Sequence, residues 1–452
     1  MKIQALSLVP PPEAAQNPQL TPELLASVFA RYSRSNDGLD LILSKVDLTN
    51  PTESIGRILK FIDYGHASIG GMVAGLAIAF DGISMFAAYK IFELAQMADG
   101  QEGSTRYIPM NETGLPDWSG LGFSTEQAAR LQEWSLMGIS LYERTKAALD
   151  KCAEENPSIV RIPAKLANKP AAVKRLRVNY GLDRTRYFLP FAMKTNMALV
   201  MSARMWTEVI TGLLSANTPE LTSVANQIKH VLTPYAPHTL SHGRVKAGWT
   251  QARDADNPCF ISRSSRINYS ALHEAPCAVS VFTDFTDAEI AAAISSRENR
   301  YDRCGIAARD TTVRITWNGM SIAELRDLNR HRTGSRFAPL FHVGLYLPTE
   351  TKQVLAADAS LQRDFCAWEA LRLEAAAVDK DLIPYTLCLG SMVPAFRHTT
   401  QLDKVVYTTE LRTGAGAHFR YADHYGAVVD GLRAAGYPLT AAAIQVGDAE
   451  PE

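Results

Sequence analysis

Cysteine is scarce in this sequence and has no pattern that would give it a shared role. The six cysteines are Cys152, Cys259, Cys277, Cys304, Cys366 and Cys388. None of them forms a CxxC pair or stands at a metal-ligand spacing to histidine. The scatter suggests neither a zinc site nor a disulfide framework, so we interpret the cysteines as reduced thiols that bind no metal.

Three further absences limit the kind of protein this is. Lysine plus arginine (46) nearly equals aspartate plus glutamate (47), which argues against a general nucleic-acid binder. The N-terminus MKIQALSLVPPPEAAQNP lacks the charged-then-apolar order of a signal peptide, and the longest apolar stretch, roughly residues 67–80, is too short to span a bilayer. We therefore expect a cytoplasmic protein without a nucleic-acid or membrane partner.

The length of the chain favours more than one domain. At 452 residues it exceeds the size at which a single core usually keeps growing, and its 46% apolar and 21% charged content is that of an ordinary globular protein. Three consecutive prolines predict an irregular arm, and clusters of Gly, Asn, Pro and Ser mark a linker. We predict an N-terminal arm at 1–20, a first domain at 21–242, a linker at 243–276, a second domain at 277–445 and a flexible tail at 446–452.

Similar patterns occur in both halves of the sequence. In the first half, the apolar run MVAGLAIAFDGIS at 72–84 predicts a buried strand with a helix directly after it. In the second half, TTVRITWNG alternates as a strand, and we expect Asn318-Gly319 to stop it. Ser321 and Glu324 then predict a capping box at the start of the helix SIAELRDLNRHR. The repeated order of strand, glycine, serine and helix is a first sign of internal duplication.

The nine residues NRHRTGSRF, at 329–337, concentrate positive charge. Arg330, Arg332 and Arg336 surround His331, and the stretch contains no acidic residue. One interpretation is a solvated basic helix end, because cations complement the helix dipole at its C-terminus. The other is phosphate recognition, because guanidinium groups match the geometry of phosphate oxygens. Composition alone does not choose between the two.

The cluster resembles the signature of a known family, the flavin-dependent thymidylate synthases. That signature reads Arg-His-Arg, two residues, Ser, one residue, Asn-Glu, one residue, Ser, one residue, Arg-Tyr, at the end of a helix introduced by a Gly-x-Ser turn. The second half of this chain supplies RHRTGS and then departs from the pattern. The first half supplies the rest in GQEGSTRY, with Glu102, Ser104, Arg106 and Tyr107, but reads LAQ at the Arg-His-Arg positions. Each half keeps what the other lacks.

A second segment resembling the family is divided in the same way. In the family, an arginine before a Leu-Pro pair binds nucleotide phosphate, an Asn-x-Arg contacts the flavin, and a later Leu-Arg faces the pyrimidine. The first half has Arg186, Ser202, Arg204 and Leu213 at these positions, and the second half has Tyr385, Gln401, Asp403 and Arg412. In both segments the first and last of these residues are 27 positions apart, and the segments align without a gap. The turn DYGHAS, with His66 and Ser68, also resembles the family's Gly-His turn near the flavin.

The resemblance implies a fold and an assembly. The fold would be α+β, with two tandem thymidylate-synthase-complementing-protein-like α/β domains that form a pseudo-dimer. Family members are homotetramers whose sites draw on several subunits, so a fused pair would form a homodimer that mimics the tetramer. Because the losses are complementary, we expect two active sites per homodimer.

The activity that the resemblance implies is the reductive methylation of dUMP at C5 to dTMP. Methylenetetrahydrofolate would be the one-carbon donor, FAD the cofactor and NADPH the reductant. The implied substrate-binding residues around the 5′-phosphate are Ser104, Arg106 and Arg186, with Glu102 in the same loop. The implied flavin-binding residues are Arg330, His331, Arg332, Arg204, Gln401, His66 and Ser68. Arg412 would act at the pyrimidine edge, where a fixed cation favours the N3-deprotonated base and raises electron density at C5.

One residue leaves the substrate open. The family usually has Gln three residues before the Arg-His-Arg, where it contacts the base, and this chain has Asp327. A carboxylate only accepts hydrogen bonds, so it would suit an exocyclic amine unless it pairs with Arg330 or Arg412. We keep dUMP as the first choice of pyrimidine nucleotide. The alternatives are C5 alkylation of another pyrimidine nucleotide, such as a cytosine nucleotide or UMP, and a non-catalytic nucleotide- or flavin-binding relative.

Overall fold

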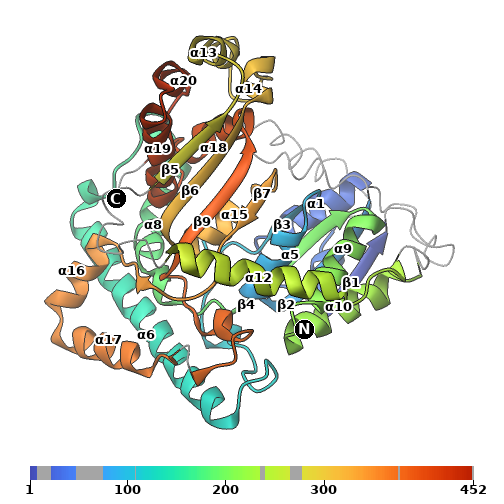
Figure 1. Cartoon of the computed structure of the whole chain (residues 1–452). Helices are drawn as coiled ribbons and strands as arrows, with labels where there is room; N and C mark the ends of the chain where they lie inside the picture. The colour runs from blue at the N-terminus through green and yellow to red at the C-terminus, as the bar shows by residue number, and fades with distance from the viewer. Residues whose placement is uncertain are drawn as a thin grey trace. The chain divides into compact units, whose positions relative to one another are not determined.

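The protein is described by a computed structural model that confirms the predicted α+β class (Figure 1). The described residues are 1–7, 22–46, 75–106, 108–234, 240–264, 277–374 and 377–449. They divide into two compact units: unit 1 comprises Met1–Leu136, Pro190–Asp256 and Arg372–Thr386, and unit 2 comprises Met137–Leu189, Asn257–Leu371 and Leu387–Glu452. Each unit therefore takes residues from both halves of the sequence.

Unit 1 contains a four-stranded antiparallel sheet with the strand order β1-β2-β4-β3. The strands are β1 (Lys2–Ser7), β2 (Leu76–Ser84), β3 (Asp99–Glu102) and β4 (Lys194–Met201). Its helices are α1 (Pro22–Tyr32), α2 (Leu39–Ser44), α5 (Met85–Leu94), η3 (Glu112–Gly114), α9 (Ala203–Leu214), α10 (Pro219–Leu232) and η8 (Ile383–Thr386). In register, Ile3 lies opposite Phe80, and Ala79 lies opposite Ala198.

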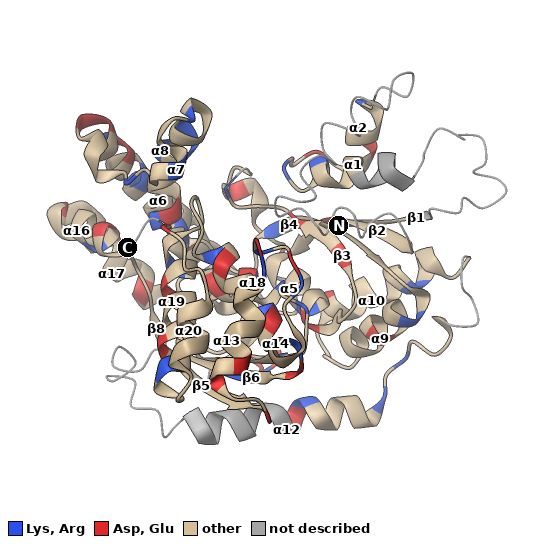
Figure 2. Cartoon of the chain, turned by 90° about the horizontal axis from the view of Figure 1, so that it is seen from above, with Lys and Arg blue, Asp and Glu red and all other residues tan. Residues whose placement is uncertain are grey.

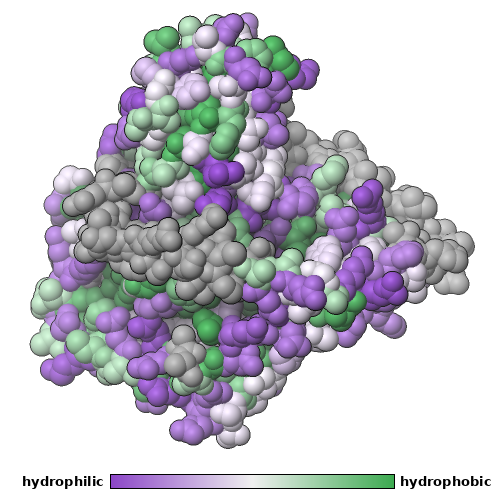
Figure 3. All heavy atoms as spheres, in the orientation of Figure 1, coloured by the Kyte–Doolittle hydropathy of each residue, from purple (hydrophilic) through white to green (hydrophobic). Residues whose placement is uncertain are grey.

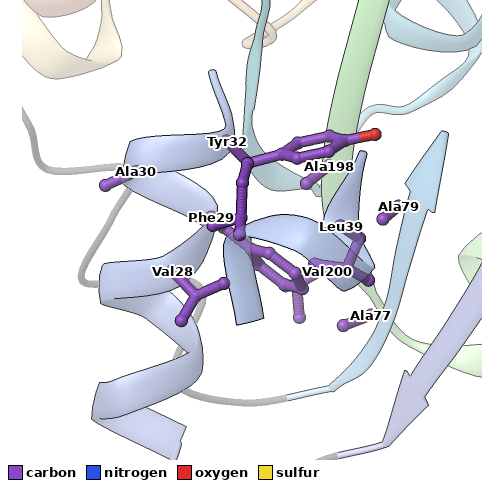
Figure 4. Packing of buried hydrophobic residues seen from close by; sticks show 10 residues of the cluster. Val28, Phe29, Ala30, Tyr32, Leu39, Ala77, Ala79, Ala198 and Val200 are labelled. Carbon is purple, nitrogen blue, oxygen red and sulfur yellow. The ribbon is translucent and has the colours of Figure 1, made fainter. Parts of the chain in front are cut away.

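Helices α1 and α2 cover one part of this sheet with apolar side chains (Figure 4). Phe29 and Tyr32 of α1 and Leu39 of α2 pack with Ala79 of β2 and Val200 of β4. Small alanines on the strands leave room for the aromatic rings of α1, so ring and sheet approach closely. The Tyr32 hydroxyl, buried here, donates to the Phe80 carbonyl over 2.7 Å, which satisfies its polar end.

Unit 2 contains a sheet with the order β5-β6-β9-β7, and the short strand β8 also pairs with β9. The strands are β5 (Cys277–Phe282), β6 (Thr312–Ser321), β7 (Ser335–Phe337), β8 (Gly344–Leu345) and β9 (Ser391–Gln401). Its helices are η4 (Pro157–Ile159), α7 (Ala164–Ala167), α8 (Pro170–Thr185), η5 (Arg186–Phe188), α13 (Asp287–Ser295), α14 (Ile306–Asp310), α15 (Ile322–Asn329), α16 (Thr349–Ala357), α17 (Ala359–Leu371), α18 (Leu402–Arg412), α19 (Phe419–Ala434) and α20 (Pro438–Ala443). The division between the units falls within α6 (Thr125–Glu155) and α12 (Ala247–Ser264).

The helices that follow equivalent strands begin at equivalent positions. Ser84 caps α5 directly after β2, and Ser321 is the N-cap of α15 directly after β6. Ser202 is the N-cap of α9, and Gln401 is the N-cap of α18. The gapless alignment of the two segments therefore pairs one N-cap residue with the other, which we call the cap-on-cap alignment. The main four-strand path has the same order in both units.

A glycine with positive φ stands two residues before both cap serines, and in β2 it coincides with a shift in the strand register. Gly82 and Gly319 have φ values of 72° and 69°, in the left-handed region that favours glycine. Strand β6 was predicted to stop at Asn318-Gly319, which is wrong, because pairing resumes beyond the glycine with Met320 opposite Val393. The register of β6 against β9 is unchanged across this glycine, so the cap serine still belongs to the strand.

Two other predicted segments differ from the structure. An irregular arm was expected over 1–20, but residues 2–7 form β1, an edge strand of the first sheet. A linker was expected over 243–276, but α12 occupies Ala247–Ser264. The three consecutive prolines led to the first error, although they follow the strand in sequence. Polar composition led to the second error, because an exposed helix needs few apolar residues.

Charges of both signs are interspersed along the chain (Figure 2), and hydrophilic and hydrophobic side chains are mixed on the face shown in Figure 3. Within the described part of the chain, every helix is too short or too polar to cross a lipid bilayer.

Candidate functional site

The arginine-rich segment follows α15 in unit 2. Arg330 is the C-cap of this helix, so the helix brings it next to Asp327, one turn earlier, with which it forms an ion pair. Both side chains are partly buried, at 27% and 18% exposure. The structure therefore supplies the arginine partner for Asp327 that sequence reasoning left open.

Arg412 lies at the end of α18 and is held by two side chains of the same unit. Its Nε donates to His331 Nε2 over 3.0 Å. Its guanidinium carbon lies 5.1 Å from the centre of the Tyr421 ring. Because the arginine Nε–H can only donate, His331 Nε2 accepts, and the neutral ring carries its proton on Nδ1.

Arg186 belongs to the first half of the sequence but to unit 2 of the structure. It begins η5, at the end of α8, and is 4% exposed. Its Nη2 donates to the Tyr421 hydroxyl over 3.3 Å. Tyr421 thus contacts both Arg186 and Arg412, the arginines assigned to phosphate and base.

Charge in this cluster is predominantly positive. Burial would raise the pKa of Asp327, but Arg330, Arg186 and Arg412 hold it well below its usual range. The pKa of His331 lies well below its ordinary value, first because of burial and then because of Arg412. At neutral pH the cluster therefore combines three guanidinium groups, one carboxylate and an uncharged imidazole.

A buried carboxyl group connects α15 to the segment that carries Arg186. Glu324 is fully buried and accepts from the Tyr187 hydroxyl over 2.9 Å and from the Ser321 hydroxyl. Burial raises the pKa of Glu324, although Arg420 and Arg186 lower it. The predicted capping box is wrong in detail, since the Ser321 hydroxyl donates to Glu324 instead of capping the backbone. Sequence reasoning therefore found Glu324 but not its contact with Tyr187.

Two further predicted residues, Arg332 and Gln401, belong to unit 2. Arg332 follows His331 and is partly buried. Gln401 is exposed at the N-cap of α18, at the opposite end of that helix from Arg412.

The predicted substrate loop lies in unit 1, directly after β3. Glu102 ends this strand opposite Met197 and is 3% exposed. The Ser104 backbone N–H donates to Ser33 over 3.2 Å, and the Arg106 backbone N–H donates to the Ser104 hydroxyl over 3.3 Å. These contacts fix the course of the loop.

Arg204 lies apart from this loop on α9. Its side chain is 87% exposed, and its Nε lies 3.6 Å from Oε1 of Glu208 on the same helix. Two other predicted flavin contacts, His66 and Ser68, fall outside the described residues.

The region of unit 1 equivalent to the arginine cluster has different chemistry. Leu213, at the position of Arg412, is fully buried. Tyr385, at the position of Arg186, donates from its hydroxyl to Glu220 over 2.9 Å and packs its ring 4.7 Å from that of Phe86. Ser84 also donates to Glu220, over 2.6 Å. Aromatic and aliphatic side chains therefore fill this region.

Sequence reasoning missed Tyr421 entirely. It is the third residue after His418, the N-cap of α19, and no motif or periodicity distinguishes it from other tyrosines. Only the packing of α19 shows that it contacts Arg186 and Arg412.

The fold and this cluster define an α+β protein with a set of buried and half-buried arginines suited to an anionic ligand. Residues 18–238 match the family model of the thymidylate synthase complementing protein. This part of the chain is therefore similar to that family, the ThyX family.

One solved structure similar to this chain is Thymidylate Synthase X (ThyX) from Helicobacter pylori with FAD and dUMP. The two share 14% identity, the alignment covers 37% of this chain and 99% of that one, and the TM-score is 0.25. A superposition this loose carries no argument about individual residues. No curated protein matches the chain.

Proposed function

We propose that this protein is a flavin-dependent thymidylate synthase-like enzyme. The proposed reaction is the reductive methylation of dUMP at C5 to dTMP, with methylenetetrahydrofolate as the one-carbon donor, FAD as cofactor and NADPH as reductant. The match of residues 18–238 to the ThyX family model supports the reaction class. The observation that carries the proposal is the joint placement of Arg186 and Arg412 on Tyr421.

This placement suits a nucleoside monophosphate, which has one anionic end and one heterocyclic end. Arg186 is buried and can hold a phosphate dianion through charge-assisted hydrogen bonds. Arg412, fixed by His331 and Tyr421, would stabilise negative charge on the base. The charge favours loss of the N3 proton and makes C5 a better nucleophile.

The donor groups after α15 fit a flavin dinucleotide. Arg330 and Arg332 stand two residues apart and present guanidinium groups, which match pyrophosphate oxygens. In the protein without ligand, Asp327 compensates Arg330. When bound, FAD would supply the redox chemistry, and the protein would supply binding and orientation.

Ser104 and Arg106, in the loop of unit 1 after β3, are further proposed phosphate-binding residues. Ser104 offers a hydroxyl and Arg106 a guanidinium group, and Gly103 lets the loop pass close to β4, where its N–H donates to Asn196 over 2.7 Å. We propose that Glu102 fixes this loop, since it is buried at the end of β3. Arg204, Gln401, His66 and Ser68 remain proposed flavin contacts.

The ion pair of Asp327 with Arg330 favours dUMP over a cytosine nucleotide. A carboxylate that is compensated by arginine needs no exocyclic amine from the substrate. C5 alkylation of a cytosine nucleotide or of UMP remains the alternative to be tested beside dUMP.

We infer that the chain is an internal duplication with one surviving composite site. The shared strand order and the cap-on-cap alignment support duplication of the segments within 21–242 and 277–445. We propose a homodimer with two active sites, located in the cytoplasm. Light scattering should give twice the 49.6 kDa of one chain, and a monomer would refute the assembly.

The proposed function is tested by a visible spectrum of the purified protein with added FAD, followed by titration with dUMP, dCMP and UMP. Bound flavin whose spectrum responds to dUMP, with release of the C5 hydrogen, supports the proposal. A response to dCMP or UMP alone supports the alternative substrate. Failure to bind FAD excludes both hypotheses of an enzyme. Binding of FAD and nucleotide without turnover supports a non-catalytic relative.

A further inference from the structure

Tyr421 contacts two arginines that come from distant parts of the sequence. Arg186 lies on η5 and Arg412 ends α18, whereas Tyr421 lies in the first turn of α19. The tyrosine side chain is 5% exposed, so surrounding atoms fix its position. All three residues belong to unit 2.

The two ends of this side chain make different contacts. The hydroxyl oxygen accepts from Arg186 Nη2 over 3.3 Å. The ring lies 5.1 Å from the guanidinium carbon of Arg412, within the range of a cation–π interaction. Hydroxyl and ring can therefore be removed separately by substitution.

The ring and His331 both help to orient Arg412. His331 accepts from Nε over 3.0 Å and sets the direction of the guanidinium group. The Tyr421 ring restricts its tilt, because a cation is held best over the face of the ring. Losing either contact would leave Arg412 charged but less well oriented.

We propose that Tyr421 is a positioning residue that fixes the spacing between the phosphate arginine and the base-facing arginine. It would act through Arg186 and Arg412 and would not touch the reacting atoms. Its hydroxyl would support binding of a 5′-phosphate, and its ring would support the chemical step. The role in turnover rests on the proposed function, whereas the role in phosphate binding is measured without turnover.

Unit 1 has no equivalent of this side chain. The third residue after Thr218, the N-cap of α10, is Leu221, a fully buried aliphatic residue. The corresponding arginine positions hold Tyr385 and Leu213. The tyrosine therefore occurs in the unit that has the arginines to position.

The test compares Tyr421→Phe with Tyr421→Leu in the full-length protein carrying FAD. The Phe variant removes only the hydroxyl, so the KM for dUMP should rise about tenfold while kcat stays within about twofold. The Leu variant also removes the ring, so kcat should fall a further tenfold or so. Tyr301 supplies matched controls, since its ring lies 5.8 Å from the Arg300 guanidinium carbon but is 46% exposed. Tyr301→Phe and Tyr301→Leu should leave both constants unchanged.

Calorimetric binding of dUMP and deoxyuridine separates this inference from the proposed function. Tyr421→Phe should weaken dUMP about tenfold and leave deoxyuridine, which lacks the phosphate, unchanged. If the unmodified protein binds dUMP without turnover and Tyr421→Phe shows this selective loss, the proposed function fails and the phosphate-binding role stands. If Tyr421→Phe binds dUMP normally, or if the unmodified protein does not bind dUMP, the inference is overturned. If Tyr421→Leu does not fold, the Phe variant still decides the point.

Discussion

Unit 1 and unit 2 use the same strand order but place their buried carboxyl groups on different helices. In unit 2 the carboxyl group that binds the serine preceding α15 is Glu324, on α15 itself. In unit 1 the carboxyl group that binds the equivalent serine, Ser84, is Glu220, on α10. Arg420 stands in unit 2 at the position of Glu220, counted from the N-caps.

A tyrosine hydroxyl completes both arrangements. Tyr187 donates to Glu324 over 2.9 Å, and Tyr385 donates to Glu220 over 2.9 Å. Serine, glutamate and tyrosine therefore meet in each unit, although neither the glutamates nor the tyrosines are at equivalent positions. A common scaffold can retain a hydrogen-bond pattern while exchanging the residues that make it, because burial requires only that each polar group has a partner.

The consequence of this exchange concerns charge. Unit 2 places arginines next to its carboxyl groups, whereas Tyr385 of unit 1 packs between the rings of Phe86 and Phe123. We interpret the arginine cluster of unit 2 as a ligand-binding region and the equivalent region of unit 1 as one filled by side chains.

The largest expected effect is the loss of activity on substitution of Arg412. Arg412→Ala should reduce release of the C5 hydrogen by about a thousandfold or more, because the charge that stabilises the ionised base is lost. FAD should remain bound. Arg433→Ala, an exposed arginine on α19 paired with Asp430, is the control and should retain activity. Normal turnover by Arg412→Ala would refute the assignment of the site to unit 2.

The next effect concerns stability. Arg297 and Glu410 of unit 2 form an ion pair at 2.8 Å with both side chains 4% exposed. Arg297→Ala should lower the free energy of unfolding by about 3–5 kcal/mol, because it leaves a buried carboxylate uncompensated. Arg433→Ala, which removes an exposed pair, should cost no more than about 0.5 kcal/mol. Equal effects in urea denaturation would show that burial does not distinguish these pairs.

Acid should affect unit 2 before unit 1. Burial lowers the pKa of three histidines of unit 2, His331, His398 and His424, and that of His398 to about 4. Below pH about 6.5 the unfolded chain binds more protons at these sites than the folded one, so stability falls as the pH falls, by up to about 1.4 kcal/mol per pH unit for each histidine.

Two carboxyl groups of unit 1 have the opposite effect on stability as the pH falls. Burial raises the pKa of Asp81 and Glu220, so the folded form binds the extra protons and gains stability as the pH falls toward 4.5. In unit 2, Glu324 makes a contribution of the same sign to stability, because burial raises its pKa as well. Hydrogen exchange at pH 7 and pH 5 should show protection lost first in unit 2, and a uniform loss would contradict the comparison.

The smallest effect distinguishes the two glutamates. Burial is the main cause of the raised pKa at both sites, but only Glu324 has Arg420 and Arg186 among its lowering partners. Glu220→Gln should stay within about 1 kcal/mol of the unmodified stability at pH 7, whereas Glu324→Gln should cost about 1–3 kcal/mol. Thermal unfolding measures the stability of both variants. A larger loss for Glu220→Gln than for Glu324→Gln would show that Arg420 and Arg186 do not cause the difference.

Much of the fold follows from local sequence patterns. The strand before Ser84, the helix after it and their counterparts around Ser321 follow from apolar runs, alternation and cap residues. Arg186 was chosen as a candidate from the sequence, but no local pattern indicates that it contacts Tyr421 of α19 rather than the sheet of its own half. That placement depends on contacts between residues more than a hundred positions apart, which periodicity does not encode.

The residues of the candidate site that belong to short sequence motifs could be predicted from the sequence. The residues that reach the site only through the packing of distant helices could not. The segment RHR and Arg412 could be found from spacing, and the pairing of Asp327 with Arg330 was one of the stated alternatives. Tyr421 could not be found, because its contacts with Arg186 and Arg412 arise from the position of α19 beside η5 and α18. The periodicity of a helical sequence indicates which of its residues are buried, but not which arginines from other segments contact them.

The measurement that tests the central claim most directly is tritium release from [5-³H]dUMP by the purified protein with FAD, NADPH and methylenetetrahydrofolate. The account predicts release by the unmodified protein and by Arg433→Ala, and loss of release in Arg412→Ala with FAD still bound. Bound FAD with no tritium release from the unmodified protein would contradict it.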